Sequence, residues 1–350
     1  MEFGFPFSYE FVKSTLVFSE TKQFFEENKK KVEEIQKLAW IYHGLWKLIP
    51  ESLETLFSGH SFPYMDSWEE LQVSFLLCAQ GLYKQSFISL RNAMELALVC
   101  IYFNIDDSGH IRIKDWLKSK DTFQANTPRT DNLWKVLLSN TNINAYDTEH
   151  EIRKRYNKLS YLSNYVHSKG VRYSNSIGGL KSNFQTFEEK ALDNWITAFS
   201  EVVKIVTIIY LLRYPIGMVK YNWSIKCGID NPFPVLEEGQ IEKIEQVLDF
   251  KEIETLRRIS LQDKETNEIM NYIEALPDMD DEDIEEQIIR LDKLEIQGGI
   301  GFIEWEKREK EQMLQYSEET KIKIESRISK IREWALENNY MESRLFEFRK

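Results

Sequence analysis

The sequence predicts an all-α fold, on the basis of its composition, its scarcity of chain-breaking residues and its apolar periodicity. Hydrophobic residues make up 42% of the 350 positions and charged residues 29%, as in soluble globular proteins. The 14 glycines and 8 prolines are too few for a turn-rich β architecture. In several segments apolar residues recur at spacings of three and four, the period of a helix that buries one face.

Five helices are expected in the first two-thirds of the chain, at 21–48, 67–80, 82–103, 149–168 and 187–213. Asp66, Thr148 and Thr186 each precede a glutamate by three positions, which indicates capping boxes where three of these helices begin. Gly81 and Pro215 mark the ends of two. The segments 82–103 and 187–213 are apolar nearly all round, so both are expected in the middle of a bundle.

The helix expected at 149–168 has an apolar stripe and a second stripe of polar and aromatic residues. The second stripe has spacings of four, three and four, at Tyr156, Ser160, Ser163 and His167. Residues 171–182, which are rich in serine, asparagine and glycine, are expected to form a surface loop.

A second domain is expected after a break in the pattern at Gly228, Pro232 and Pro234. The sequence is therefore divided into a helical bundle domain at 1–230 and a smaller acidic helical accessory domain at 235–350. Helices are expected in this second part at 240–248, 251–260, 264–276 and 282–294, followed by a long helix at 302–338. One apolar stripe runs along that long helix, at Met313, Tyr316, Ile324, Ile328, Ile331 and Ala335.

The formal net charge of −12 is carried by the second domain. Residues 236–350 hold 31 acidic and 18 basic residues, whereas residues 1–235 hold 26 and 27. The acidity therefore counts against nucleic-acid binding only for the tail. The acidic run at 278–286 lacks the central glycine of a calcium loop and is interpreted as a turn that leads into a helix N-terminus.

Several classes of protein are excluded by what the sequence lacks. The opening residues do not predict a signal peptide, and the longest apolar runs are eight residues, far short of the roughly 20 that span a bilayer. Three cysteines, an odd number, indicate a reduced, cytoplasmic protein without a membrane partner. No phosphate-binding loop, dinucleotide fingerprint, HExxH, CxxC or GxSxG motif occurs, so no cofactor or metal ligand is assigned.

Three residues are the first candidates for chemistry. Arg91 and Glu95 stand at i and i+4 on an otherwise apolar helix, and His167 ends the polar stripe of another. A structural interpretation makes the first two a buried salt bridge and the histidine a favourable residue at a helix C-terminus. A functional interpretation has the pair facing His167 across the bundle, with Arg91 available to neutralise a phosphate.

Two helical motifs resemble the divergent bacterial branch of the HEPN superfamily. The segment SLRNAMELA at 89–97 is followed by Tyr156-x-x-Leu159-Ser160 and then by Leu162-Ser163-x-Tyr165-Val166-His167. The resemblance covers roughly residues 68–213. It implies a small α-helical bundle of a kind that is often a dimeric ribonuclease in toxin–antitoxin and antiphage systems.

What the resemblance implies is metal-independent RNA cleavage by a homodimer. The histidine assists attack of the ribose 2′-hydroxyl on the adjacent phosphate, and an arginine stabilises the developing charge. Carried onto this chain, the histidine is His167, with Ser163 or Asn164 as its hydrogen-bonding neighbours. The family places an arginine a few positions before the histidine. Here the nearest is Arg155, about three turns away, so Arg91 would act from the neighbouring helix.

A non-enzymatic scaffold or partner-binding subunit is the alternative. On this hypothesis Arg91, Glu95 and His167 form a buried network, and the acidic C-terminal region docks a cognate protein. A third hypothesis is that the tail mimics nucleic-acid charge and masks a basic face. Solvent access at the three residues distinguishes chemistry from packing.

Overall fold

The computed structural model describes residues 11–50, 59–106, 109–118, 128–170, 173, 186–229 and 235–343. Within these residues the chain forms helices and no strand, so the all-α class is confirmed. The loop expected at 171–182 lies outside the described residues, apart from Tyr173. Contacts divide the chain into two compact units. The first holds the described residues up to Tyr221 together with 235–269, and the second holds 222–229 and 270–343.

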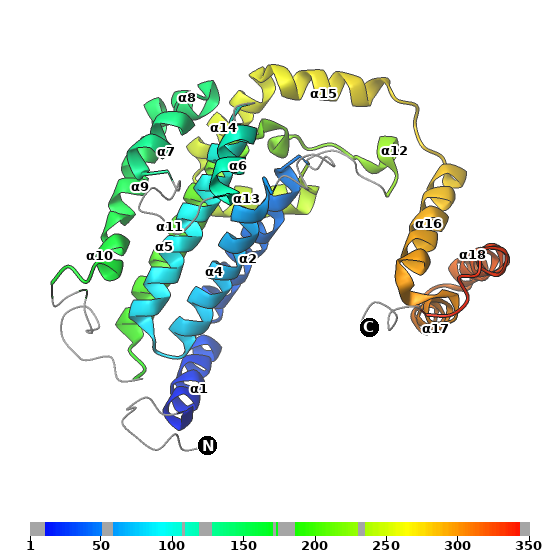
Figure 1. Ribbon diagram of the computed structural model, residues 1–350, viewed down its shortest axis with the longest axis horizontal. Helices are drawn as coiled ribbons and strands as arrows, with labels where there is room; N and C mark the ends of the chain where they lie inside the picture. The colour runs from blue at the N-terminus through cyan, green and yellow to red at the C-terminus, as the bar shows by residue number, and fades with distance from the viewer. Residues whose placement is uncertain are drawn as a thin grey trace. The chain divides into compact units, whose positions relative to one another are not determined.

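The first unit is a bundle in which most helices pack around two central ones (Figure 1). Its first half contains α1 (Phe11–Glu27), α2 (Lys29–Gly44), η1 (Leu45–Leu48), α4 (Phe62–Ala79), α5 (Tyr83–Asn104) and α6 (Gly109–Leu117). It continues with α7 (Thr130–Leu137), α8 (Thr141–His150), α9 (Ile152–Lys158), η2 (Leu159–Tyr161), α10 (Leu162–Val166) and α11 (Glu189–Arg213). It is completed by η4 (Pro215–Met218), α13 (Glu238–Val247) and α14 (Phe250–Gln262).

The two central helices are α5 and α11, as their apolar sequences predict. They run beside one another (Figure 1), and α11 buries 16 of its 25 residues while α5 buries 14 of its 22. Each large apolar side chain buried in this way contributes roughly 1.5–3 kcal/mol to stability. Polar contacts fix the register, because the Tyr210 hydroxyl donates to the Ala97 carbonyl (3.2 Å) and Arg213 Nε to the Asn104 carbonyl (2.7 Å). This rigid pair positions the residues that α5 directs to the surface.

By length and apolar composition, α5 and α11 are also the two described helices that could cross a membrane. Most of each apolar stretch is buried inside the bundle, as in the core helices of soluble proteins. The structure is therefore compatible with a soluble protein.

Helix ends differ from the predictions wherever long-range packing decides them. The helix expected at 21–48 breaks at Asn28, whose backbone is not helical (φ −118°, ψ 52°) and whose side chain donates to the Phe24 carbonyl (2.8 Å). The predicted capping boxes are wrong. Asp66 and Thr148 lie inside α4 and α8, and α11 begins after Glu188 rather than at Thr186.

The helix expected at 149–168 is also wrong, because it is broken twice. Glu151 has a left-handed backbone (φ 51°) between α8 and α9, and the Asp147 carboxylate accepts from the Arg153 amide (2.8 Å) to satisfy the new N-terminus. The tighter turn η2 then separates α9 from α10. Because residues at i and i+3 eclipse in such a turn, Leu159 and Leu162 both reach the core.

The division between the units also differs from the predicted domain boundary at 230–235. Helices α13 and α14 lie in the predicted accessory domain but pack against the first unit. Ile253 and Leu256 of α14 enter its core, and the Ser260 hydroxyl donates to the Pro215 carbonyl (2.7 Å). These contacts bury the apolar side of α14. The charged sequence of α14 does not by itself indicate which unit covers that side.

The second unit is a smaller helical cluster. It contains α12 (Ser224–Cys227), the end of α15 (Lys264–Ala275), α16 (Asp281–Glu295), the π-helical turn η5 (Ile296–Ile300), α17 (Phe302–Met313) and α18 (Glu318–Glu337). The acidic run at 278–286 leads into the N-terminus of α16, as predicted. The Asp280 carboxylate caps this helix by accepting from the Glu282 (2.9 Å) and Asp283 (3.0 Å) amides.

The long helix predicted at 302–338 is wrong, because the chain turns back between α17 and α18. The Ser317 side chain caps α18 by accepting from the Thr320 amide (3.3 Å). The Phe302 amide donates to the Tyr340 carbonyl (2.8 Å), which joins the start of α17 to the end of α18. The apolar stripe of α18 is therefore covered in part by Trp305 of the same chain.

A half-buried ion network ties α16 to this hairpin. Arg327 Nε lies 3.3 Å from Asp292 Oδ2, and its Nη2 donates to Glu309 Oε2 (2.6 Å). Burial is the main cause that raises the pKa of Asp292 to about 6, with Glu309 adding to the rise and Arg327 opposing it. Protonated Asp292 is therefore favoured more in the folded unit than in the unfolded chain.

Acidification should stabilise the second unit. A folded-state pKa above the ordinary value means that the folded unit takes up a proton first, so stability is lost as pH rises through about 6 and is regained as pH falls. The sequence of this unit contains no histidine. We expect the free energy of unfolding to rise by about 1 kcal/mol from about pH 7 to about pH 5. Urea titration with pulsed hydrogen exchange of α17 and α18 measures it.

The matched control is Asp292→Asn, which should abolish this rise. A rise that persists in the variant would assign the pH dependence to another group.

Candidate functional site

The Arg91–Glu95 pair forms on α5 as the i, i+4 spacing predicts. Arg91 Nη2 lies 2.7 Å from Glu95 Oε1, and the side chains are 19% and 31% exposed. Arg91 Nε is buried without a hydrogen-bond partner among the described residues. An unsatisfied donor of this kind is costly and is the sort of group that a bound anion can satisfy. The pair is therefore partly open and retains unused donor capacity.

His167 is held at the surface by the end of α10. This short helix packs on α5, where Tyr165 stacks on Phe87 with ring centroids 4.9 Å apart. The His167 amide donates to the Ser163 carbonyl (3.1 Å), and the side chain is exposed. Next along the chain, Ser168 has a left-handed backbone (φ 46°). The imidazole is thus presented to solvent by a well-packed support.

Electrostatics join these residues into one cluster. Burial raises the pKa of Glu95, while Arg91 and, more weakly, His167 oppose that rise by charge attraction. Burial likewise raises the pKa of the Tyr156 hydroxyl on α9, and Glu95 adds to that rise. His167 is thus near enough to Glu95 for their charges to interact, and Tyr156 is a fourth member of this electrostatic cluster, which was predicted only as part of a stripe.

Ser163 and Asn164 support the histidine through the backbone. Both are half-buried, and their side chains make no hydrogen bond to a described residue. The Ser163 carbonyl accepts from His167, and the Asn164 carbonyl accepts from the Lys169 amide (3.0 Å). Their expected side-chain bonds to His167 are absent from the described part of the chain.

A second cluster surrounds Arg155, which lies too far from His167 along the predicted helix to share one phosphate with it. Arg155 donates from Nε to Glu201 Oε1 (2.7 Å), from Nη2 to Glu201 Oε2 (3.2 Å), and from Nη1 to Glu252. The Tyr146 hydroxyl also donates to Glu252 (3.2 Å). The network joins α8, α9, α11 and α14. This network was missed in the sequence, where the one indication of it was Glu201, a charged residue on the apolar helix α11.

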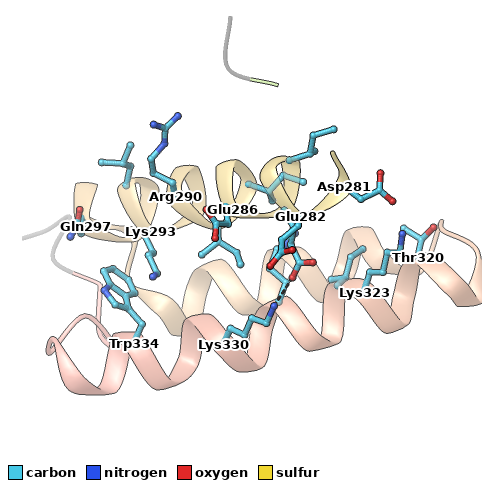
Figure 2. A pocket seen from close by; sticks show the side chains of 17 residues that line it. Asp281, Glu282, Glu286, Arg290, Lys293, Gln297, Thr320, Lys323, Lys330 and Trp334 are labelled. Carbon is cyan, nitrogen blue, oxygen red and sulfur yellow. Dashed lines mark hydrogen bonds and ion pairs between the residues drawn. The ribbon is translucent and has the colours of Figure 1, made fainter. Parts of the chain in front are cut away.

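The second unit contains a groove of about 1230 Å³ between α16 and α18. Figure 2 shows Lys293 and Trp334 facing each other at one end, where Lys293 Nζ lies 5.2 Å from the ring centroid. Lys330 reaches from α18 to Glu285 of α16 (2.7 Å). The groove thus has an apolar floor and charged edges that partly pair with one another.

No group of three or more His, Cys, Asp or Glu side chains in the described part of the chain could hold a metal ion. No protein-family model, curated protein sequence or solved structure matches this chain. The HEPN resemblance therefore rests on the two helical motifs.

Proposed function

We propose that this protein is a cytoplasmic, homodimeric HEPN-like ribonuclease of a toxin or antiphage system that cleaves RNA without a metal ion. His167 removes the proton from a ribose 2′-hydroxyl, and the 2′ oxygen bonds to the adjacent phosphorus. The bond to the 5′ oxygen breaks, and that oxygen takes a proton from solvent. The products are a 2′,3′-cyclic phosphate and a 5′-hydroxyl. Arg91 stabilises the charge that develops on the phosphate, and Glu95 orients Arg91.

The observation that carries this proposal is the solvent access of the cluster. His167 is exposed, and the Arg91–Glu95 pair, whose carboxylate interacts with the charge of His167, is partly open rather than sealed in the core. Helix α9, which precedes η2 and α10 along the chain, has the sequence IRKRYNK, with four basic and no acidic residues. Three of these cations pair with acids, and Lys158 is exposed without an acidic partner in the described part of the chain. An exposed cation of this kind favours a polyanionic substrate.

Comparison of RNA with DNA of the same sequence tests the proposal. With a chelator present, the purified full chain should cleave tRNA or total RNA to cyclic-phosphate ends and leave DNA intact, because DNA lacks the attacking hydroxyl. Mass spectrometry of the fragments identifies those ends. Failure to cleave any RNA, equal cleavage of DNA, or loss of activity in the chelator would contradict it.

A partner-binding scaffold is the second candidate, favoured by the groove between α16 and α18. None of the residues of α16 is fully buried, and Leu291 and Leu294 are 41% and 56% exposed. Such an apolar surface fits an amphipathic helix of a cognate protein. A chain that cleaves no RNA in the assay above would favour this candidate. The masking of a basic face by the acidic tail stays a further hypothesis.

A further inference from the structure

A pocket of the first unit lies where α9, α11 and the start of α14 meet. Its volume is about 670 Å³, within the range of pockets that bind small ligands. None of its lining residues belongs to the His167 cluster. Four cations line it, namely Arg155, Lys158, Lys204 and Lys251, together with three acids.

The three acids of this pocket are already engaged. Glu201 receives two bonds from Arg155, and Glu252 accepts from Arg155, from Tyr146 and from the Asp249 amide (3.1 Å). The Asp249 carboxylate accepts from the Glu252 amide in a capping box. Arg155 offsets one of these three negative charges, and hydrogen bonds occupy the carboxylates, so the four cations leave the pocket lining with a net positive charge.

The three lysines are not compensated in the same way. Lys158 and Lys251 are exposed and Lys204 is half-buried, and none has an acidic partner in the described part of the chain. Lys251 is the second residue of α14, a helix of 13 residues whose N-terminal dipole adds positive potential. Three unpaired ammonium groups around one cavity favour a phosphate.

An aromatic ring stands at the same pocket. Phe250 is 72% exposed, lies next to Lys251 in the chain and makes no ring contact with the described residues. An exposed aromatic ring beside basic side chains is the combination on which nucleotide bases stack while their phosphates are held.

We propose that this pocket binds a nucleotide, with the phosphate on Lys158, Lys204 and Lys251 and the base stacked on Phe250. The site goes beyond the proposed function, because it shares no residue with the cleavage cluster and needs no reaction. The nucleotide is either a free nucleoside monophosphate or one unit of an RNA strand, which present the same groups.

Fluorescence anisotropy with labelled AMP and the full chain tests the proposal at low, constant salt. AMP should bind more tightly than adenosine or inorganic phosphate. Lys204→Ala should weaken AMP binding by about tenfold. Phe250→Ala should weaken it roughly 5- to 100-fold without changing competition by inorganic phosphate. Lys135→Ala, which removes an exposed lysine of α7, is the matched control and should have no effect.

Two further arms separate the possible outcomes. His167→Ala should bind AMP as the wild type does, so a failure of RNA cleavage leaves this site standing, and the reverse also holds. A short oligoadenylate that binds more tightly than AMP would assign the pocket to a strand, and equal affinity would assign it to the mononucleotide. No AMP binding, or unchanged binding by both pocket variants, overturns the proposal. An effect of Lys204→Ala without one of Phe250→Ala overturns the nucleotide assignment.

Discussion

His167→Ala should lower the rate of RNA cleavage by about 10²–10⁴-fold, the usual contribution of a general base. The imidazole is exposed and makes no hydrogen bond to a described residue, so its removal leaves the packing of α10 on α5 unchanged. The backbone bond to the Ser163 carbonyl is also kept. Initial rates on a labelled RNA, with circular dichroism to verify folding, measure the effect.

A matched control for this change is His43→Ala. His43 is exposed on α2, where its ring contacts Trp68 at 5.1 Å, and it belongs to neither cluster. Cleavage by this variant should equal that of the wild type. Wild-type cleavage by His167→Ala would remove His167 from the reaction and with it the proposed mechanism.

Arg155→Ala should lower the free energy of unfolding of the first unit by roughly 3–5 kcal/mol, the usual cost of leaving buried charges unpaired. The Arg155 side chain is 19% exposed, while those of Glu252 and Glu201 are 9% and 33% exposed. Burial lowers the pKa of Arg155, but the two carboxylates outweigh burial and raise the pKa overall, so they hold the guanidinium in its charged form. Without it, two carboxylates face each other across α11 and α14. Urea unfolding measures the change.

The surface pair Arg258–Glu149 gives the comparison for that variant. Its side chains are 54% and 44% exposed, so solvent screens the pair and Arg258→Ala should cost far less than Arg155→Ala. If Arg155→Ala costs no more than Arg258→Ala, the Arg155 network does not hold α14 to the first unit.

Features that depend on neighbours a few residues apart were predictable. The Arg91–Glu95 pair follows from the i, i+4 spacing, which places two side chains on one helix face in any tertiary context. The central positions of α5 and α11 follow from sequences that offer no polar face to water. That the pair faces His167 was a hypothesis from the two polar patterns and stays one, and the exposure of His167 was not predictable.

Features that depend on contacts between distant segments of the chain were not predictable from the sequence. The break at Glu151 lets the Asp147 carboxylate cap the next helix, and the turn η2 lets Leu159 and Leu162 both reach the core. The helical period of the sequence predicts neither break. Arg155 was judged only against His167, whereas its partners Glu201 and Glu252 are 46 and 97 residues away.

By itself the sequence determined the helical class, the two core helices α5 and α11, and the charged pair Arg91–Glu95 on α5. These features depend only on composition and on spacings within a few residues, which are the same in any tertiary context. Tertiary structure alone decided that α13 and α14 join the first unit, that α17 and α18 form a hairpin, and that His167 is exposed to solvent. These outcomes depend on which apolar surfaces cover one another, and many pairings are compatible with the same periodic pattern until the whole core is assembled.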